Sequence, residues 1–352
     1  CAAPWISSIS SNRLLLALAP ERTRPGMHSW FDPPADGFTN ARWFAADLHL
    51  PGRWVGFLQL DDAALQRNVF LDSRIDAPWQ RCVQVPFDAL AQQSWPQTRV
   101  GWLFHTSFCC STLLARMLFC APHCTALREP MLLRRLADAR FADWPLAGVM
   151  ELPLRLLARP WHEGATVLVK PTHAALNIAP DLLELRTGER ALVLTSTLED
   201  FVVSNIKKTP ETHARVGELV ARALKALGVA LPPSPPPDLL CQVAVQWAAQ
   251  AMLVGRLLER FGAARVRVLQ ERVLLADPVA VSAAANAWLQ LGIPDAVLAE
   301  QALRAGALHA KAETRPYGLA QRDHEASIIR QHYGADILRA LRWADRHLQP
   351  WL

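Results

Sequence analysis

From Arg99 onward, short apolar runs alternate with longer amphipathic stretches along the chain. Each apolar run is bounded by polar or turn-forming residues, as in strands that are buried on both faces of a parallel sheet. Strands separated by helical patterns predict an α/β layered fold. The predicted strands are Val100–His105, Thr166–Lys170, Ala191–Thr195 and Val266–Leu269.

The amphipathic stretches predict helices that flank this sheet. A proline-rich segment, LPPSPPP at 231–237, can be neither helix nor central strand. We interpret it as an exposed connector inside the fold, because the strand at 266–269 must still join the sheet. The predicted helices are 111–119, 130–139, 146–157, 198–208, 213–227, 239–261, 277–291, 296–305 and 323–345.

Residues 1–98 have a different texture, rich in Trp, Pro and Asp and without a strong helical period. Strand-like pieces occur at Trp54–Leu60, Asn68–Leu71 and Cys82–Pro86. We therefore predict a small β-containing N-terminal module at 1–98 and an α/β domain at 99–352.

Composition narrows the class of protein. The chain has 352 residues, of which 51% are hydrophobic and 20% charged, as expected of a globular protein. Its apolar runs are too short or too interrupted for a membrane span. The formal net charge is +5, and the positive charge is scattered, which fits an anionic small ligand better than nucleic acid.

The seven cysteines are odd in number, and two of them, Cys109 and Cys110, are adjacent. This pattern predicts neither a disulfide framework nor a metal site, and favours a reducing cytoplasm. The apolar stretch within Ser7–Pro20 lacks a basic leader, so we do not expect it to be a secretory signal.

The most informative segment runs from Val100 to Leu118: a strand, a loop of small polar residues, and a helix that opens with Ser111 and Thr112. Unpaired amides at a helix start, with two hydroxyls beside them, can bind phosphate or sulfate. The alternative is an ordinary helix cap. The GxxxxGK[ST] pattern of nucleotide triphosphatases is absent. Cys110 and Arg116 have the Cys-x5-Arg spacing of a phosphatase with a catalytic cysteine. The residues between them have a helical pattern, however, and a helix cannot surround a phosphate as such a loop does.

This segment resembles the phosphosulfate-binding loop of the sulfotransferase superfamily, whose parallel sheet is of the P-loop type. Ser107–Leu114 (SFCCSTLL) matches the family pattern in its paired hydroxyls and following helix. It departs from the pattern at Phe108, where the family has a cation, and at Cys110, where it has glycine.

Later segments follow in the family's order. Glu129-Pro130 comes 17 residues after Thr112, at the spacing of the proton-accepting glutamate in the tyrosylprotein branch. Lys170 ends a strand resembling the bacterial Lys-Thr-Pro strand. Ala191–Ser204 resembles the segment that binds the nucleotide 3′-phosphate, with Ser196 in place of the family's arginine. Residues 266–278 and the helix after them resemble the last core strand, so that the resemblance covers about residues 99–348.

The resemblance implies transfer of a sulfuryl group from 3′-phosphoadenosine 5′-phosphosulfate (PAPS) to a hydroxyl or amine of a small molecule, giving adenosine 3′,5′-bisphosphate and using no metal. Glu129 would be the base, with a pKa raised by burial, and Lys170 would stabilise the leaving oxygen. The residues expected to bind the nucleotide are His105, Thr106, Ser107, Cys109, Cys110, Ser111, Thr112, Ser196, Ser204 and Arg315.

Two cations that the resemblance implies are missing, one at Phe108 and one at Ser196. Their absence keeps other functions open. His105 or Arg116 could replace the first, and Lys207 and Lys208 the second. Otherwise the protein is a phosphotransferase that uses a nucleoside triphosphate with Mg²⁺, or a catalytically degenerate protein that binds an anion or nucleotide.

Overall fold

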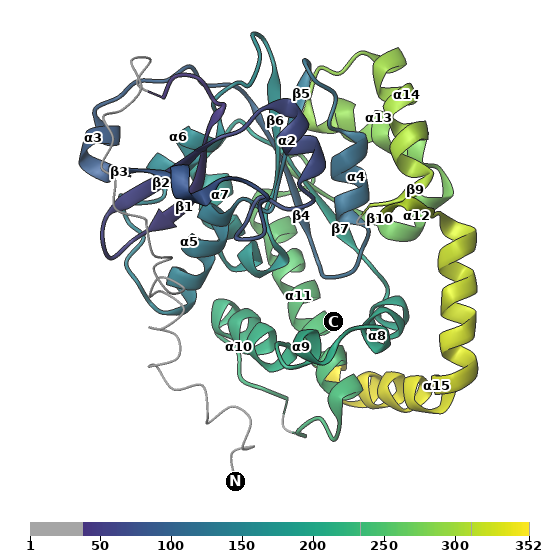
Figure 1. Ribbon diagram of the computed structural model, residues 1–352. Coiled ribbons are helices and arrows are strands. Elements are labelled where there is room, and N and C mark those ends of the chain that lie inside the picture. Colours follow the sequence, from purple (N-terminus) through teal and green to yellow (C-terminus); the bar gives the residue numbers. More distant parts are fainter. Residues whose placement is uncertain (1–37, 233, 311, 352) are drawn as a thin grey trace.

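The computed structural model describes residues 38–232, 234–310 and 312–351, without the side chains of 311–315 and 350. The predicted features within Ser7–Pro20, together with Pro233 of the proline-rich connector, lie outside the described residues. Within them, the fold is an α/β fold with a five-stranded parallel sheet flanked by helices and a small antiparallel N-terminal sheet (Figure 1).

The central sheet has the strand order β5-β6-β4-β7-β8, and every neighbouring pair is parallel. All five strands therefore end at the same edge. Four of them confirm the sequence prediction nearly residue for residue; β5, at one border, shows in the sequence only as a strand-like stretch before Glu129. The strands are β4 (Val100–His105), β5 (Cys124–Arg128), β6 (Thr166–Lys170), β7 (Ala191–Thr195) and β8 (Val266–Gln270).

Most predicted helices are present, with shifted ends. The predicted helix 146–157 begins only at Glu151, since Gly148 has a positive φ of 73° that interrupts helical backbone. The longest helix changes direction at Tyr333, as the yellow ribbon of Figure 1 shows. The helices after β4 are α4 (Ser111–Met117), α5 (Met131–Phe141), α6 (Glu151–Leu157), η2 (His173–Ile178), α7 (Ala179–Leu185), α8 (Leu198–Ile206), α9 (Pro210–His213), α10 (Val216–Leu227), α11 (Leu239–Phe261), α12 (Glu271–Ala276), α13 (Pro278–Leu289), α14 (Asp295–Gly306) and α15 (Leu319–Leu348).

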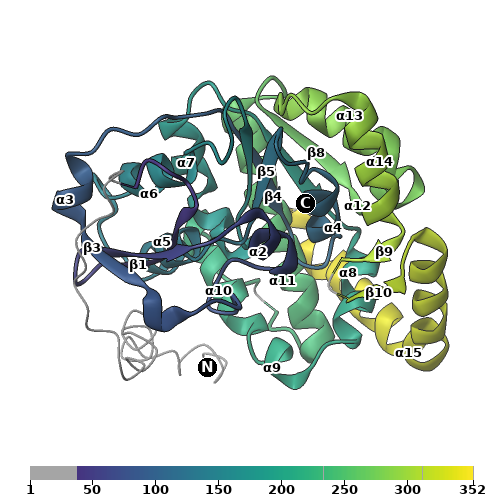
Figure 2. The same ribbon diagram turned by 45° about the horizontal axis from the view of Figure 1, so that its top comes forward.

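Two groups of helices enclose the sheet. Helices α4, α13 and α14 contact one another, and α4 and α13 also contact strands of the sheet. A second group, η2, α7, α10 and α11, forms a separate set of contacts that reaches β4 and β8. Figure 2 shows α13 and α14 at the opposite end of the molecule from the N-terminal sheet. None of the described helices is both long and apolar enough to cross a bilayer.

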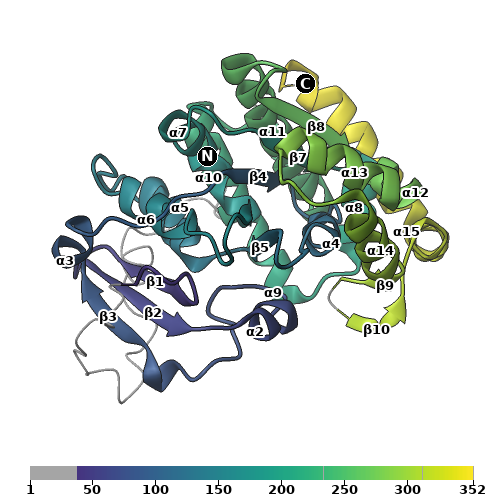
Figure 3. The same ribbon diagram turned by 90° about the horizontal axis from the view of Figure 1, so that it is seen from above.

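The N-terminal sheet consists of β1 (Trp43–His49), β2 (Trp54–Gln59) and β3 (Val83–Pro86), all antiparallel (Figure 3). The predicted strand at Asn68–Leu71 is wrong: this segment follows the short helix α2 (Asp62–Arg67) as irregular chain. The reason is the Asn68 side chain, which donates to the carbonyl of Ala64 and accepts from the amide of Asp76, and thereby closes a turn.

Buried arginines connect the N-terminal residues with the rest of the fold. Arg128, which ends β5, donates to the carbonyls of Leu65 and Asn68, and Arg159 donates to that of Trp43 at 2.7 Å. Both side chains are almost completely buried, so their charges depend on these carbonyl partners. The division into two units at residue 98 stays a prediction.

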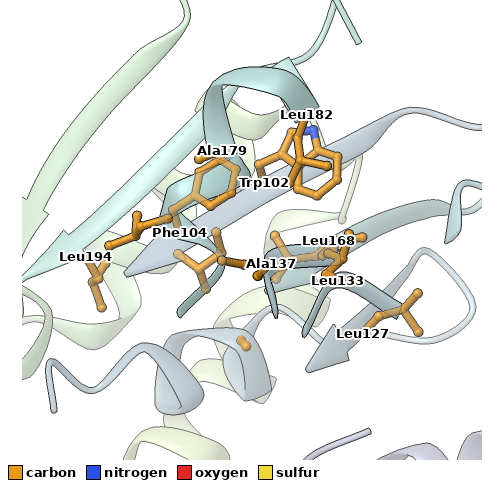
Figure 4. Packing of buried hydrophobic residues seen from close by; sticks show 14 of the residues in the cluster. Trp102, Phe104, Leu127, Leu133, Ala137, Leu168, Ala179, Leu182 and Leu194 are labelled. Carbon is orange, nitrogen blue, oxygen red and sulfur yellow. The ribbon is translucent and has the colours of Figure 1, made fainter. Parts of the chain in front are cut away.

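The core lies on both sides of β4. Its aromatic residues Trp102 and Phe104 lie with parallel rings, 5.7 Å between centroids, and pack beside Leu168 and Leu194 of the neighbouring strands (Figure 4). The Trp102 indole donates to Glu189 at 2.7 Å, which satisfies the one polar atom of this side chain. A rigid, fully buried central strand therefore holds the loop that follows His105.

Candidate functional site

A cavity of about 690 Å³ opens where the sheet ends, in the size range of small-molecule sites. Ligands in open α/β sheets bind at this edge, beyond the carboxyl ends of the strands. Seven cationic residues line the cavity, against four anionic ones, so its wall favours an anionic ligand. The cations are Arg74, Arg134, Arg135, Lys207, Lys208, Arg215 and Arg322, and the anions are Asp72, Glu129, Asp138 and Glu325.

The loop before α4 has the backbone of a glycine-rich turn without containing glycine. Phe108 and Cys110 have φ angles of 60° and 61°, in the left-handed region. This geometry explains why the family pattern has glycine where this chain has Cys110. The first hydrogen bond of the helix is made by the amide of Leu113, and Ser111 and Thr112 before it line the cavity.

Three of the predicted loop residues, Thr106, Ser107 and Cys109, make hydrogen bonds within the protein. The Ser107 amide donates to Gln250 at 3.3 Å, and Cys109 donates its thiol to the Thr106 carbonyl at 3.0 Å. Burial raises the pKa of the Cys109 thiol to about 12, so it is a small core residue and not a nucleophile. Ser107 and Cys109 still contribute to the cavity wall.

Neither proposed replacement for the missing cation is positioned to bind an anion. The two ring nitrogens of His105 lie 2.8 Å and 2.9 Å from the carbonyls of Thr106 and Pro171. Burial lowers the pKa of His105 well below its ordinary value, so the ring is neutral. Arg116 donates to the Ala310 carbonyl at 3.0 Å and holds the loop between β9 (Leu308–His309) and β10 (Ala312–Pro316).

Phe108 does not plug the cavity. Its ring packs against Phe201 of α8, with centroids 5.7 Å apart, and the ammonium of Lys208 lies over it at 4.6 Å. Lys208 itself lines the cavity. A cation–π contact of this kind therefore places a positive charge beside the loop from which the family's own cation is missing.

Elsewhere in the cavity wall, a buried polar cluster joins α8, α12 and α15. Arg322 donates to Glu271 at 2.5 Å, to Tyr317 at 3.3 Å and to Ser204 at 3.4 Å. The guanidinium nitrogen that donates to Tyr317 also lies 4.0 Å from the sulfur of Cys110. Ser204 is among the residues that the sequence predicts to bind a nucleotide. Arg322 is not, although it follows the predicted Arg315 by seven residues. Because Arg322 lines the cavity beside Ser204, it offers the cation that Ser196 cannot.

Glu271 gives this cluster a titratable centre. Burial raises its pKa to about 7, against the opposing effect of Arg322. One of its carboxylate oxygens has no hydrogen-bond partner among the described residues. The charge of the carboxylate that holds Arg322 therefore changes near neutral pH.

The other residues expected near the nucleotide 3′-phosphate are not all placed in the cavity. Ser196 is buried and does not belong to the described wall of the cavity; the indole of Trp247 donates to its carbonyl. Lys207 forms an ion pair of 2.6 Å with Glu325. The side chain of Arg315 lies outside the described residues.

Glu129 and Lys170 form a buried ion pair with 2.6 Å between Nζ and Oε1. Lys170 is only 1% exposed, so its ammonium stands behind Glu129 rather than in the cavity wall. Burial raises the pKa of Glu129, but the charge and hydrogen bond of Lys170 outweigh it and lower the pKa below its ordinary value. The expectation of a raised pKa is therefore wrong: the carboxylate is ionised. Its backbone φ of 56° is a strained value for glutamate.

The surroundings of Glu129 add residues that the sequence did not indicate. Arg74 lies 3.6 Å from its second oxygen and is also paired with Asp72. His173 lines the same part of the cavity, and burial lowers its pKa to about 3, so it is a neutral imidazole. Its position three residues after Lys170 was the only signal in the sequence.

Two parts of the cavity wall differ in their chemistry. The part with the start of α4, Ser204 and Arg322 offers hydroxyls and a cation to an anion. The part with Glu129 offers an ionised carboxylate that can accept a proton. Among the described residues, no group of three or more His, Cys, Asp or Glu side chains could hold a metal ion.

Comparison with known proteins finds no matching family model and no matching curated protein. Among solved structures, the sulfotransferase domain of the curacin biosynthetic pathway is similar at 14% identity, covering 66% of this chain and 83% of that one, with a TM-score of 0.37. A sulfotransferase from Alicyclobacillus acidocaldarius aligns at 17% identity over 56% and 83%, with a TM-score of 0.35.

The sulfotransferase domain of the Synechococcus PCC 7002 olefin synthase aligns at 14% identity over 62% and 80% of the two chains, with a TM-score of 0.35. The resemblance to sulfotransferases that the sequence predicts is thus also found among solved structures. With TM-scores this low, the similarity assigns neither a substrate nor a site residue to this chain.

Proposed function

We propose that this protein transfers a sulfuryl group from PAPS to a hydroxyl or amine of a small-molecule acceptor. The observation that supports it is a single cavity in which the hydroxyl-bearing start of α4, the Ser204–Arg322 pair and the ionised Glu129 all take part. The donor set suits a nucleotide with phosphates at two positions, because hydroxyls and cations stand at two separate places on the wall.

Ser111 and Thr112 would hold the phosphosulfate, with the positive charge of Lys208 close by. Ser204 and Arg322 would hold the 3′-phosphate. When bound, PAPS supplies a sulfuryl group whose S–O bond to the nucleotide breaks while a bond to the acceptor oxygen or nitrogen forms.

Glu129 would accept the proton that the acceptor loses. It is ionised and borders the cavity, although its lowered pKa makes it a weak base that works only on an acceptor held in hydrogen-bond contact. In the structure, Lys170 donates to Glu129. Lys170 is buried behind this carboxylate and outside the described cavity wall, so its charge would act on the reaction through Glu129. Lys170 would thus hold the base in place and keep the pKa of Glu129 low.

Calorimetry with adenosine 3′,5′-bisphosphate tests the donor site. We expect micromolar binding, weakened about tenfold in Ser111→Ala and in Ser204→Ala, since each substitution removes one hydrogen bond to phosphate. The matched control is Ser282→Ala, a buried serine whose hydroxyl donates to the sulfur of Met117 away from the cavity. No binding at millimolar nucleotide would overturn the proposal.

A second experiment distinguishes transfer of a sulfuryl group from transfer of a phosphoryl group. Thermal shifts with PAPS and with ATP–Mg²⁺ should differ, and only PAPS should stabilise the protein. Stabilisation by ATP–Mg²⁺ alone would favour the phosphotransferase. Binding of PAPS without transfer of radioactive sulfate to any of a broad set of alcohols and amines would favour a catalytically degenerate protein.

A further inference from the structure

A cluster of charged residues at α5 and α10 borders the cavity and carries more positive than negative charge among the described residues. Three guanidinium groups share two carboxylates there. Arg134 and Arg222 both bond to Asp138, at 2.8 Å and 2.7 Å. Glu218 is shared by Arg222 at 3.0 Å, Arg134 at 3.5 Å and Arg215 at 4.0 Å.

The members of this cluster differ in what they can offer a ligand. Arg222 is buried and also donates to the Ala137 carbonyl at 2.8 Å, so it belongs to the core. Arg134 and Arg215 line the cavity, and the side chain of Arg215 is 52% exposed. With 4.0 Å to its carboxylate partner, Arg215 has the longest of these ion pairs and is the easiest to redirect towards a ligand.

The cluster lies close to the proposed base. The charges of Arg134 and Arg215 both act on the ring of His173, and so does the charge of Glu129. All four residues, Arg134, Arg215, His173 and Glu129, line the same cavity. One small molecule in this cavity can therefore meet both the arginine cluster and the carboxylate that would take the proton.

The cavity wall also has apolar residues. Phe70 borders the cavity with Arg74 stacked on its ring at 3.9 Å, and Met131, Val216 and Leu219 add aliphatic surface. Such a surface packs against the body of an aromatic or aliphatic ligand.

We infer that the acceptor is a hydroxy or amino compound with an apolar body and an anionic group, most simply a carboxylate, which Arg134 and Arg215 bind. This inference rests on the proposed function, because it names the acceptor of the same site. It predicts that charge on the acceptor contributes to binding rather than only to solubility.

The test is equilibrium binding of matched pairs to protein saturated with adenosine 3′,5′-bisphosphate, and to protein without it. The pairs are 4-hydroxyphenylacetate with its amide and 10-hydroxydecanoate with its amide, so that only the charge changes. We expect the anionic member of at least one pair to bind about tenfold more tightly than its amide. The difference should shrink in 0.5 M salt, which screens half-exposed charges.

Two variants should move this preference in opposite directions. Arg215→Gln should reduce it to about twofold, because one cation is lost. Glu218→Gln should increase it, because the same three guanidinium groups then share one carboxylate. Arg260→Gln is the matched control: its side chain is 55% exposed, has Glu184 as its ion-pair partner and lies outside the cavity wall. It should leave the preference unchanged.

The outcomes separate the two proposals. Tight binding of adenosine 3′,5′-bisphosphate with equal or weaker binding of both anions than of their amides would overturn the anionic acceptor alone. So would a failure of every anionic probe to bind at 10 mM. A preference for anions that follows the two variants, in a protein that binds no nucleotide, would overturn sulfuryl transfer and leave the anion site standing.

Discussion

The ammonium of Lys170 lies 2.6 Å from the carboxylate of Glu129, at the ends of two neighbouring parallel strands. The register pairs Lys170 with Arg128, and the amide of Glu129 donates to the Lys170 carbonyl at 2.6 Å. Backbone pairing and side-chain charge therefore fix the two residues together. The charge and hydrogen bond of Lys170 lower the pKa of Glu129, and neither residue can be altered alone without consequence for its partner.

Glu129→Gln should lower sulfuryl transfer at least about 100-fold, because the proton acceptor is lost. It should also destabilise the protein by about 3 kcal/mol, since it leaves the Lys170 ammonium buried without a counter-ion. Glu129→Gln/Lys170→Met should recover most of the stability and none of the activity. Urea denaturation and a radioactive sulfate assay measure the two effects; an active double variant would contradict the role of Glu129.

The contribution of the Glu129–Lys170 pair to stability should decrease as the pH falls. The pKa of Glu129 is lower in the folded protein than its ordinary value of 4.5. Its contribution to stability is therefore complete above about pH 4.5 and is lost as the pH falls through the folded pKa. Denaturation series from pH 3 to pH 7 should show a steeper loss below pH 4.5 in the wild type than in Glu129→Gln/Lys170→Met. Equal slopes would show that the pair contributes no such stability.

Nucleotide affinity should rise as the pH falls through about 7. Glu271, whose pKa is raised to about 7, competes with phosphate for Arg322 only while it is ionised. Binding is therefore coupled to proton uptake by Glu271. Calorimetry of adenosine 3′,5′-bisphosphate in two buffers of different ionisation enthalpy measures this uptake. In Glu271→Gln it should fall to the part due to the phosphate itself; unchanged uptake would contradict the prediction.

Lys208→Met should weaken adenosine 3′,5′-bisphosphate binding about tenfold and reduce its salt dependence, because a cation at the phosphosulfate loop is lost. Phe108→Leu should have a smaller effect in the same direction, since the lysine loses the ring beneath it. Lys225→Met is the control: this lysine also lies over an aromatic ring, that of Phe141, away from the cavity. Equal effects of Lys208→Met and Lys225→Met would remove Lys208 from the site.

Arg128→Met should reduce the free energy of unfolding by about 2–4 kcal/mol. The buried guanidinium donates to carbonyls of residues 65 and 68, which methionine would leave without donors. Arg81→Met, at an exposed position, should change the stability by less than about 0.5 kcal/mol. Urea denaturation of both variants provides the comparison. A stable Arg128→Met protein would show that these hydrogen bonds of Arg128 do not contribute to stability.

Much of the sheet could be predicted because its inner strands are buried on both faces and therefore appear as apolar runs, whereas the border strand β8 is mostly exposed. Val100–His105, Thr166–Lys170 and Ala191–Thr195 have the predicted bounds, as does the 23-residue helix Leu239–Phe261. The prediction failed at Asn68–Leu71, where one asparagine side chain closes a turn. Local hydrogen bonds of this kind leave no periodic signal in the sequence.

The sequence by itself determined the order of most strands and helices. Lys170 follows from the apolar run that precedes it, and Glu129 from its spacing after Thr112. Only the tertiary structure decided their charge states and partners. Arg322 reaches Ser204 from 118 residues away, and Lys170 pairs with Glu129 across 41. Such contacts depend on helix packing and strand register, and ionisation depends on burial, none of which a local pattern of residues encodes.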